Sequence, residues 1–256
     1  MRKIAQIFKG ILTFFLVFCL CLSIPFVAQQ YNALCCKCVD IHVKKHGGQS
    51  FITEKSILDL LQSKDGIPLV GTSFRKIDAY KIKKQLEIQP LVKDVWVFKN
   101  WSGVLKIVIE TKYLIARMIH PTESSGIHVY IDENGALIAI KALPLLRLLV
   151  IGGDPQNIII QENGLQCCKK ELVELLHVLY TSPFFSRQIA SLEVDKQSKI
   201  VLGTQVGNHC IEFGRAENIH AKLEKLLLFY NQVIPYKGWH AYKRVNLEFE
   251  QQLICE

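Results

Sequence analysis

The sequence contains no signature of a common enzyme class. Neither G-x-S-x-G nor H-E-x-x-H occurs, and the glycine pair at 152–153 lacks the spacing of a phosphate-binding loop. Carboxylate pairs such as Asp132-Glu133 fall in expected turns, and His177 stands alone on an expected helix, with no Ser, Cys or Asp placed to recruit it as a base. We therefore expect a protein that is not an enzyme and has no cofactor and no small-molecule substrate.

A regular metal-binding or disulfide pattern is also missing, although the chain has 9 cysteines. The Cys35-Cys36-Lys37-Cys38 cluster lacks a second Cys or His pair at zinc-like spacing, and Cys167-Cys168 are adjacent. Four tetrahedral ligands would have to converge from scattered places, so we expect no metal site. The odd number of cysteines disfavours a disulfide framework, and the sequence leaves individual pairings open.

Nucleic-acid-binding motifs are missing as well, although the formal net charge is +8. Lysine and arginine are scattered among the expected helices and strands instead of lining one element. We expect no nucleic-acid partner and interpret the charge as a basic surface that faces anionic lipid head groups or cell wall. Half of the residues are apolar, so a chain of 256 residues can bury one or two cores.

The longest apolar run covers residues 11–28 and contains no charged residue. At about 1.5 Å per residue, a helix of this length nearly spans a hydrocarbon core of about 30 Å. Arg2, Lys3 and Lys9 precede it and predict a cytoplasmic N-terminus, with the remainder exported. A cleaved signal peptide would place Phe26 where a small residue is expected, and a lipoprotein at Cys35 would place Leu34 there. We expect an uncleaved single-pass anchor.

The stretch after the anchor alternates between strand-like and helix-like patterns. Cys38–Val43 predicts a short strand, and Thr53 is a plausible N-cap for the helix that follows. A second amphipathic helix around Ile82 and Leu86 leads through Pro90 into a hairpin. Its two strands are expected at 92–99 and 104–110, because apolar residues alternate along both. The predicted order is strand, helix, helix, strand, strand.

The second half has a different pattern. A polar loop at 120–126 marks the expected domain boundary, and a helix is expected at 168–181, with a second at 216–233. Strands are expected at 128–131, 136–140, 145–151, 189–194, 200–203 and 209–213, with a final strand region at 243–255.

Both halves resemble the FtsQ/DivIB bacterial division proteins. In the first half, Pro90-Leu91-Val92 followed by the hairpin is similar to the POTRA module of that family. In the second half, four motifs follow in the family's order: Tyr130-Ile131-Asp132-Glu133-Asn134-Gly135, Leu143-Pro144, Phe213-Gly214-Arg215 and Val245-Asn246-Leu247-Glu248-Phe249. Two positions depart from the family pattern. Leu114 stands where a proline is usual, and Glu248-Phe249 replaces Arg-Tyr, which reverses a charge and removes a hydroxyl.

The resemblance implies an α+β architecture. We expect a cytoplasmic tail at 1–10, a transmembrane helix at 11–28, a POTRA domain at 36–113 and a C-terminal β domain at 114–256 with a mixed sheet and two helices. It also implies a non-enzymatic scaffold of the inner membrane at the division septum, with its bulk in the periplasm. Such a scaffold binds FtsB/FtsL-type partners and helps to control septal peptidoglycan synthesis. The alternative is a POTRA-containing exported protein of outer-membrane assembly or secretion.

Partner binding is expected at the last strand, because an edge strand exposes N–H and C=O groups to which another strand can add. The expected partner-binding residues of this segment are Val245, Leu247, Glu248, Phe249, Gln251 and Leu253. Phe249 is the expected apolar anchor. The alternative is that Leu247 and Phe249, two apart on one face of a strand, both pack inward.

Overall fold

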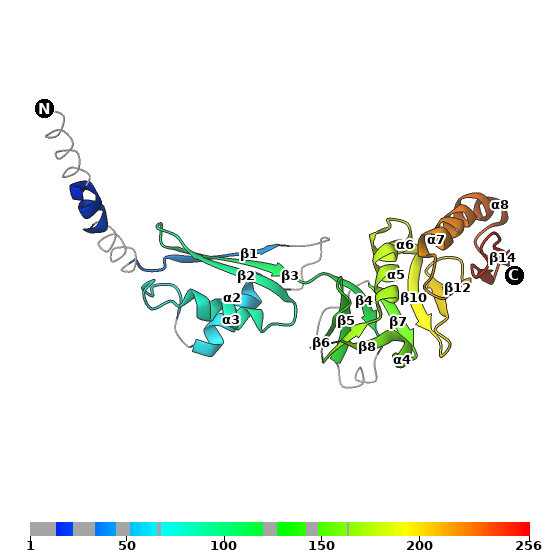
Figure 1. Cartoon of the computed structure of the whole chain (residues 1–256), viewed down its shortest axis with the longest axis horizontal. Coiled ribbons are helices and arrows are strands. Elements are labelled where there is room, and N and C mark those ends of the chain that lie inside the picture. Colours follow the sequence, from blue (N-terminus) through cyan, green and yellow to red (C-terminus); the bar gives the residue numbers. More distant parts are fainter. Residues whose placement is uncertain are drawn as a thin grey trace, which may run out of the picture. The chain divides into compact units, whose positions relative to one another are not determined.

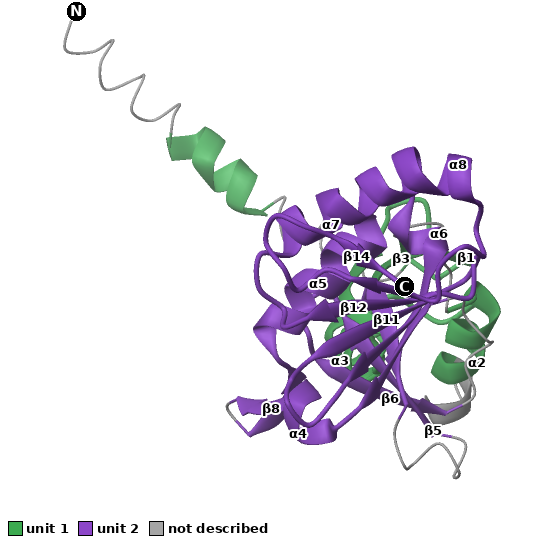
Figure 2. Ribbon diagram, turned by 90° about the vertical axis from the view of Figure 1, so that its right-hand side faces the viewer, with its two compact units in different colours: residues 1–111 green, residues 112–256 purple. Residues whose placement is uncertain are grey.

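A computed structural model describes residues 14–22, 34–44, 52–65, 68–119, 127–141, 148–162 and 164–256. The chain divides into two compact units, residues 1–111 and 112–256, which are coloured separately in Figure 2. The expected boundary loop at 120–126 and the Leu143-Pro144 motif lie outside the described residues.

The N-terminal segment is described only at residues 14–22, which are helical. The expected cytoplasmic tail and both ends of the expected transmembrane helix lie outside the described residues. Within the described part of the chain, no helix has the length and apolar character needed to cross a membrane.

Unit 1 has the predicted element order, which is thereby confirmed. Its elements are β1 (Cys38–Lys44), α2 (Glu54–Asp65), α3 (Ala79–Glu87), β2 (Val92–Lys99) and β3 (Val104–Thr111). The sheet order is β1-β3-β2, with β1 parallel and β2 antiparallel to β3, and both helices cover one face of this sheet (Figure 1).

The core of unit 1 follows from two periodicities. Alternate residues of β3, namely Leu105, Ile107 and Ile109, are fully buried, as expected for a strand with one covered face. Helix α3 faces them with Ile82 and Leu86, which lie four residues apart on one side of the helix. Its N-terminus is capped by the Asp78 carboxylate, which accepts hydrogen bonds from the N–H groups of Tyr80 and Lys81.

Unit 2 is built on one large mixed sheet, as expected. Its strands are β4 (Leu114–Met118), β5 (Ile127–Asp132), β6 (Leu137–Lys141), β7 (Leu149–Gly153), β10 (Ile189–Val194), β11 (Ile200–Thr204), β12 (Cys210–Gly214), β13 (Arg244–Asn246) and β14 (Ile254–Cys255). Their spatial order is β14-β13-β12-β11-β10-β7-β4-β5-β6. The strand β14 therefore forms one edge of the sheet, and β6 forms the other.

Two longer helices pack on this sheet through one continuous core. They are α5 (Lys170–Thr181), which buries Leu172, Leu175, Leu176 and Leu179, and α7 (Ile219–Leu228), which buries Ile219, Leu223 and Leu226. Helix α7 begins later than expected, because Asn218 has a left-handed conformation (φ 51°) that breaks the helix there. It continues into a π-helical segment, η2 (Phe229–Val233), and then α8 (Ile234–Lys237).

Three short elements were not predicted and lie before α5. They are α4 (Pro155–Ile158), β8 (Ile159–Glu162) and β9 (Leu165–Cys168). The last two pair with each other as a separate hairpin, and a further short helix, α6 (Phe185–Gln188), follows α5. Elements of four residues are too short to show a hydrophobic period, which is why the sequence pattern missed them.

The final strand region expected at 243–255 is wrong as a continuous strand. Only β13 and β14 are strands of the sheet within this region, and residues 247–253 connect them. The Leu247 N–H is still bonded to β12, since it donates to the Glu212 carbonyl at 2.9 Å. The physical cause is at Asn246, whose side-chain oxygen accepts a hydrogen bond from the N–H of Glu248 at 2.9 Å. This asparagine turn competes with strand geometry and ends β13.

Candidate partner-binding edge

The C-terminal edge of the unit 2 sheet is formed by β14 on β13. Arg244 and Glu256 exchange two backbone hydrogen bonds, each 3.0 Å long, so they form a hydrogen-bonded pair of the antiparallel ladder. The next pair, Val245 and Cys255, is therefore a non-hydrogen-bonded pair. The N–H and C=O of Cys255 consequently point away from β13, toward the outer side of the edge strand.

The solvent face of this edge is polar. The Glu212 carboxylate on β12 accepts from the Arg244 guanidinium and, at 2.7 Å, from the Asn246 amide. The hydrogen bond that Arg244 donates to Glu212 raises the pKa of the Arg244 guanidinium. Arg244 also lies 3.8 Å from the Glu256 carboxylate. These contacts hold β12 and β13 in register from the solvent side.

Helix α7 holds the segment after β13 from the other side. The Lys225 ammonium donates to the carbonyls of Leu247, at 3.3 Å, and Phe249. One turn earlier, Lys222 donates to the carbonyls of Phe213 at 3.0 Å and Arg215 at 2.8 Å. Burial lowers the pKa of Lys222. Two lysines on one face of α7 thus donate to four backbone carbonyls near the ends of β12 and β13.

Glu248 has a basic partner in the same chain. Its carboxylate oxygens lie 2.9 Å and 3.1 Å from the Lys199 ammonium, which comes from the turn before β11. This hydrogen bond raises the pKa of Lys199. Gly214, with φ 72°, makes room for the pair, because a Cβ there would lie 2.7 Å from the Cγ of Glu248.

The expected partner-binding residues fall into two groups by burial. Val245 and Leu247 have no exposed surface, and their side chains belong to the core. Glu248, Phe249 and Gln251 are exposed, and Leu253 is half-buried. Leu247 and Phe249 do not share one face, since the chain leaves the sheet after Asn246. Phe249 is 46% exposed, so of the two only Leu247 packs inward.

A buried polar cluster lies beneath the same end of the sheet. The His209 ring nitrogen Nε2 lies 2.7 Å from the Tyr230 hydroxyl. The Gln188 amide donates to that hydroxyl at 3.3 Å and to the Val206 carbonyl at 2.8 Å. Burial lowers the pKa of His209 and raises the pKa of Tyr230 to about 12, so both are neutral at pH 7. Tyr230 lies in the π-helical segment η2.

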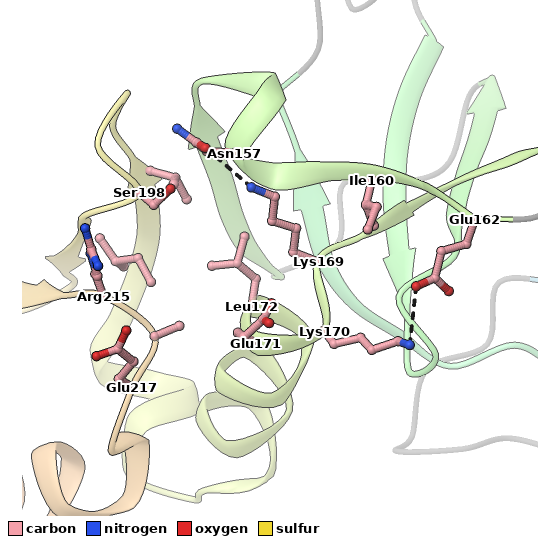
Figure 3. Close-up of a pocket in the computed structure, with 13 residues that line it drawn as sticks. Asn157, Ile160, Glu162, Lys169, Lys170, Glu171, Leu172, Ser198, Arg215 and Glu217 are labelled. Atoms are coloured by element: carbon pink, nitrogen blue, oxygen red, sulfur yellow. Dashed lines mark hydrogen bonds and ion pairs between the residues drawn. The ribbon is translucent and has the colours of Figure 1, made fainter.

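A cavity of about 500 Å³ lies elsewhere in unit 2, at the start of α5 (Figure 3). Its lining carries charges of both signs. Lys170 lies 3.3 Å from Glu162, and Lys169 donates to the side-chain oxygen of Asn157 at 3.4 Å. His177 lines a second cavity with Glu174 and His220. Among the described residues, no three His, Cys, Asp or Glu side chains are grouped to hold a metal ion.

Sequence reasoning missed the residues that hold the edge in place, namely Lys199, Lys222 and Lys225. In the sequence of α7, Lys222 and Lys225 stand next to Leu223 and Leu226, which are buried. This was a usable signal, because long side chains at the border of an apolar face reach the neighbouring backbone. For Lys199 no local signal exists, since its partner lies 49 residues away.

Comparison with known families accounts for both units. Residues 34–110 match the POTRA-like domain, and residues 115–256 match the domain described as FtsQ/DivIB, C-terminal related. No curated protein matches the chain. The matched domains are of non-catalytic scaffold type, and the family consists of division-site membrane proteins that act through protein–protein interactions. The C-terminal match covers more than half of the sequence and agrees with the motif order found there, so this chain belongs to the FtsQ/DivIB family.

Proposed function

We propose that the protein is a division-site scaffold that binds FtsB/FtsL-type membrane proteins at the C-terminal edge of the unit 2 sheet. Through them it helps to control septal peptidoglycan synthesis. In this proposal residues 11–28 cross the inner membrane once, residues 1–10 stay in the cytoplasm, and the POTRA domain (36–113) and the C-terminal β domain (114–256) lie in the periplasm. No chemistry of its own is required, only an edge that a partner can recognise.

The observation that carries the proposal is the outward direction of the Cys255 backbone. Its N–H and C=O groups point away from β13, as the pairing of Arg244 with Glu256 requires. A strand of a partner that adds beside β14 would pair with these groups. The same edge is held rigid on its solvent side by Glu212 and from α7 by Lys225. A preformed edge lowers the entropy cost of binding.

Side chains beside the edge supply specificity in this proposal. Phe249 and Ile254 are 46% and 38% exposed and offer apolar anchors, with Glu248 and Gln251 beside them. Val245 and Leu247 are buried and would act by shaping the edge rather than by touching the partner.

An experiment that tests this edge should leave the buried residues Val245 and Leu247 unchanged. Truncation after Arg244 would remove Leu247, and loss of a buried leucine side chain alone costs about 2–5 kcal/mol, so unfolding would mimic loss of binding. Cys255→Pro is a sharper change. Proline removes the outward N–H of Cys255 and fixes its φ at about −65°, but it takes away none of the N–H groups that bond β14 to β13.

We expect the full-length Cys255→Pro protein to lose co-purification with the FtsB/FtsL-type proteins of its own cell. The matched control is Cys255→Ala, which changes the same side chain but keeps the N–H, and it should retain the partners. Equal thermal unfolding of the two variants excludes a folding defect. Unchanged binding by Cys255→Pro would move the interface away from this edge, and absence of any division partner from the wild-type protein would reject the scaffold function.

A further inference from the structure

Three segments of unit 1 meet where the chain enters it. The Lys37 N–H donates to the Gly103 carbonyl at 2.8 Å, and the Gly71 N–H donates to the Cys36 carbonyl at 2.7 Å. Residues 34–37, 68–76 and 98–106 therefore form one end of the unit, which we call the entry end. Figure 1 shows the β2–β3 turn at the same end of the sheet as the start of β1.

The entry end exposes three large apolar side chains. One lies in residues 68–76 and two lie in residues 98–106. Trp101 is 59% exposed, and Phe98 and Val70 are each 54% exposed. Trp101 lies in the turn between β2 and β3. The same turn contains Gly103, whose carbonyl accepts the hydrogen bond from the Lys37 N–H. Exposed tryptophan and phenylalanine at one end of a small domain are costly in water, since each leaves a large apolar area unburied.

The charges of the entry end have a single sign. Its three segments contain no Asp or Glu. Their cations are Lys37, Arg75, Lys76, Lys99 and Lys106. On the neighbouring strand, Asp40 lies across from Lys106. The opposite end of the unit is mixed, with ion pairs between Lys93 and Glu110 and between Lys83 and Asp94.

The sequence places the entry end close to the expected anchor. Only six residue steps separate Ala28, the last residue of the apolar run, from Leu34. Six extended residues span at most about 22 Å, so the entry end cannot be far from a bilayer that holds residues 11–28. This step rests on the anchor of the proposed function.

We propose that the entry end of unit 1 docks on the surface of an anionic lipid bilayer. Trp101 and Phe98 lie at the level of the head groups, where amphipathic and aromatic rings are favoured. Arg75, Lys76 and the neighbouring cations lie over the lipid phosphates. A bilayer fits both features of this end, because it offers apolar depth and negative charge in one surface.

Fluorescence of Trp101 in the full-length protein tests the docking. The chain has 3 tryptophans, so Trp96→Phe with Trp239→Phe leaves Trp101 as the sole emitter. The matched control, Trp96→Phe with Trp101→Phe, leaves Trp239 in unit 2. Both proteins are reconstituted into vesicles of phosphatidylglycerol and brominated phosphatidylcholine and recovered by flotation. We expect the bromine to quench Trp101, with a blue-shifted emission, and to leave Trp239 unquenched.

The charge requirement is tested by Arg75→Glu in the Trp101 protein. Quenching should fall with this variant and should persist with Lys55→Glu, an equal charge change at an exposed position on α2. Quenching that persists after Arg75→Glu would overturn the electrostatic part of the proposal.

The remaining outcomes separate docking from anchoring. A protein that floats with the vesicles while Trp101 stays unquenched overturns the docking and leaves the anchor intact. A protein that does not float overturns both. A blue shift of Trp101 that grows with protein density and occurs without quenching would assign the entry end to a second copy of the chain, and would likewise overturn lipid docking.

Discussion

Lys199 and Glu248 form an ion pair, with the ammonium 2.9 Å from one carboxylate oxygen and 3.1 Å from the other. The pair connects the turn before β11 to the segment that follows β13. Glu248 stands where the family pattern has an arginine, so the charge of this position is reversed, and the structure supplies the opposite charge from within the same chain. The Glu248 carboxylate therefore has an ionic partner within its own chain.

Exchanging the two charges tests this pairing. Lys199→Glu and Glu248→Lys should each lower the urea midpoint of unfolding, because each places like charges together, and the double variant should recover it. The recovery should be modest and should fade at high salt, since exposed ion pairs contribute little and are screened. Additive losses in the double variant would show that the two charges do not interact in solution.

Gly214 is expected to tolerate no side chain. Its φ of 72° alone costs an L-residue about 1–2 kcal/mol, and a Cβ would also push the Glu248 side chain away from Lys199. Gly214→Ala should therefore lower the free energy of unfolding more than Gly164→Ala, a change at a glycine with φ 79° and no atom within 4 Å of the new Cβ. Equal losses, measured by urea titration, would mean that only the backbone conformation matters.

The sequence predicted the elements whose residues follow a long, regular period. The strands β2 and β3 and the helices α3 and α5 were located within a few residues. In the strands apolar residues alternate over eight positions, and in the helices a 3.6-residue period persists over at least two turns. The β8–β9 hairpin was missed for the opposite reason. Its strands have four residues each, which is too few for a period to emerge.

The candidate site was less accessible to sequence reasoning. The spacing of Leu247 and Phe249 indicated one strand face, but the asparagine turn at Asn246 ends the strand, and only Leu247 is buried. A hydrogen bond from the backbone to a side chain two residues earlier cannot be recognised in the pattern of apolar residues. The true edge, Ile254–Cys255, is specified by pairing with Arg244–Asn246, a tertiary relationship.

Lys225 should control the order of the segment between β13 and β14. Lys225→Met keeps the apolar stem but removes the donor to the carbonyls of Leu247 and Phe249. The loss should cost about 0.5–1.5 kcal/mol, because the Phe249 carbonyl is exposed and can accept from water instead. We expect faster amide hydrogen exchange at residues 248–253, with little change elsewhere. Lys237→Met on α8 is the control, and equal exchange in the two variants would contradict the role of Lys225.

His209 should make the protein less stable in mild acid. Burial lowers the pKa of its imidazole in the folded state, whereas the unfolded chain has the ordinary value of about 6.5. The unfolded state therefore binds the proton first as the pH falls. The stability that neutral His209 contributes is complete above about pH 6.5 and is lost as the pH falls from there through the folded-state pKa. Urea titrations at about pH 7.5 and about pH 5 bracket the ordinary histidine pKa of about 6.5. Between these two values the free energy of unfolding should fall in the wild type and should fall less in His209→Gln. Parallel curves for the two proteins would exclude His209 as the titrating group.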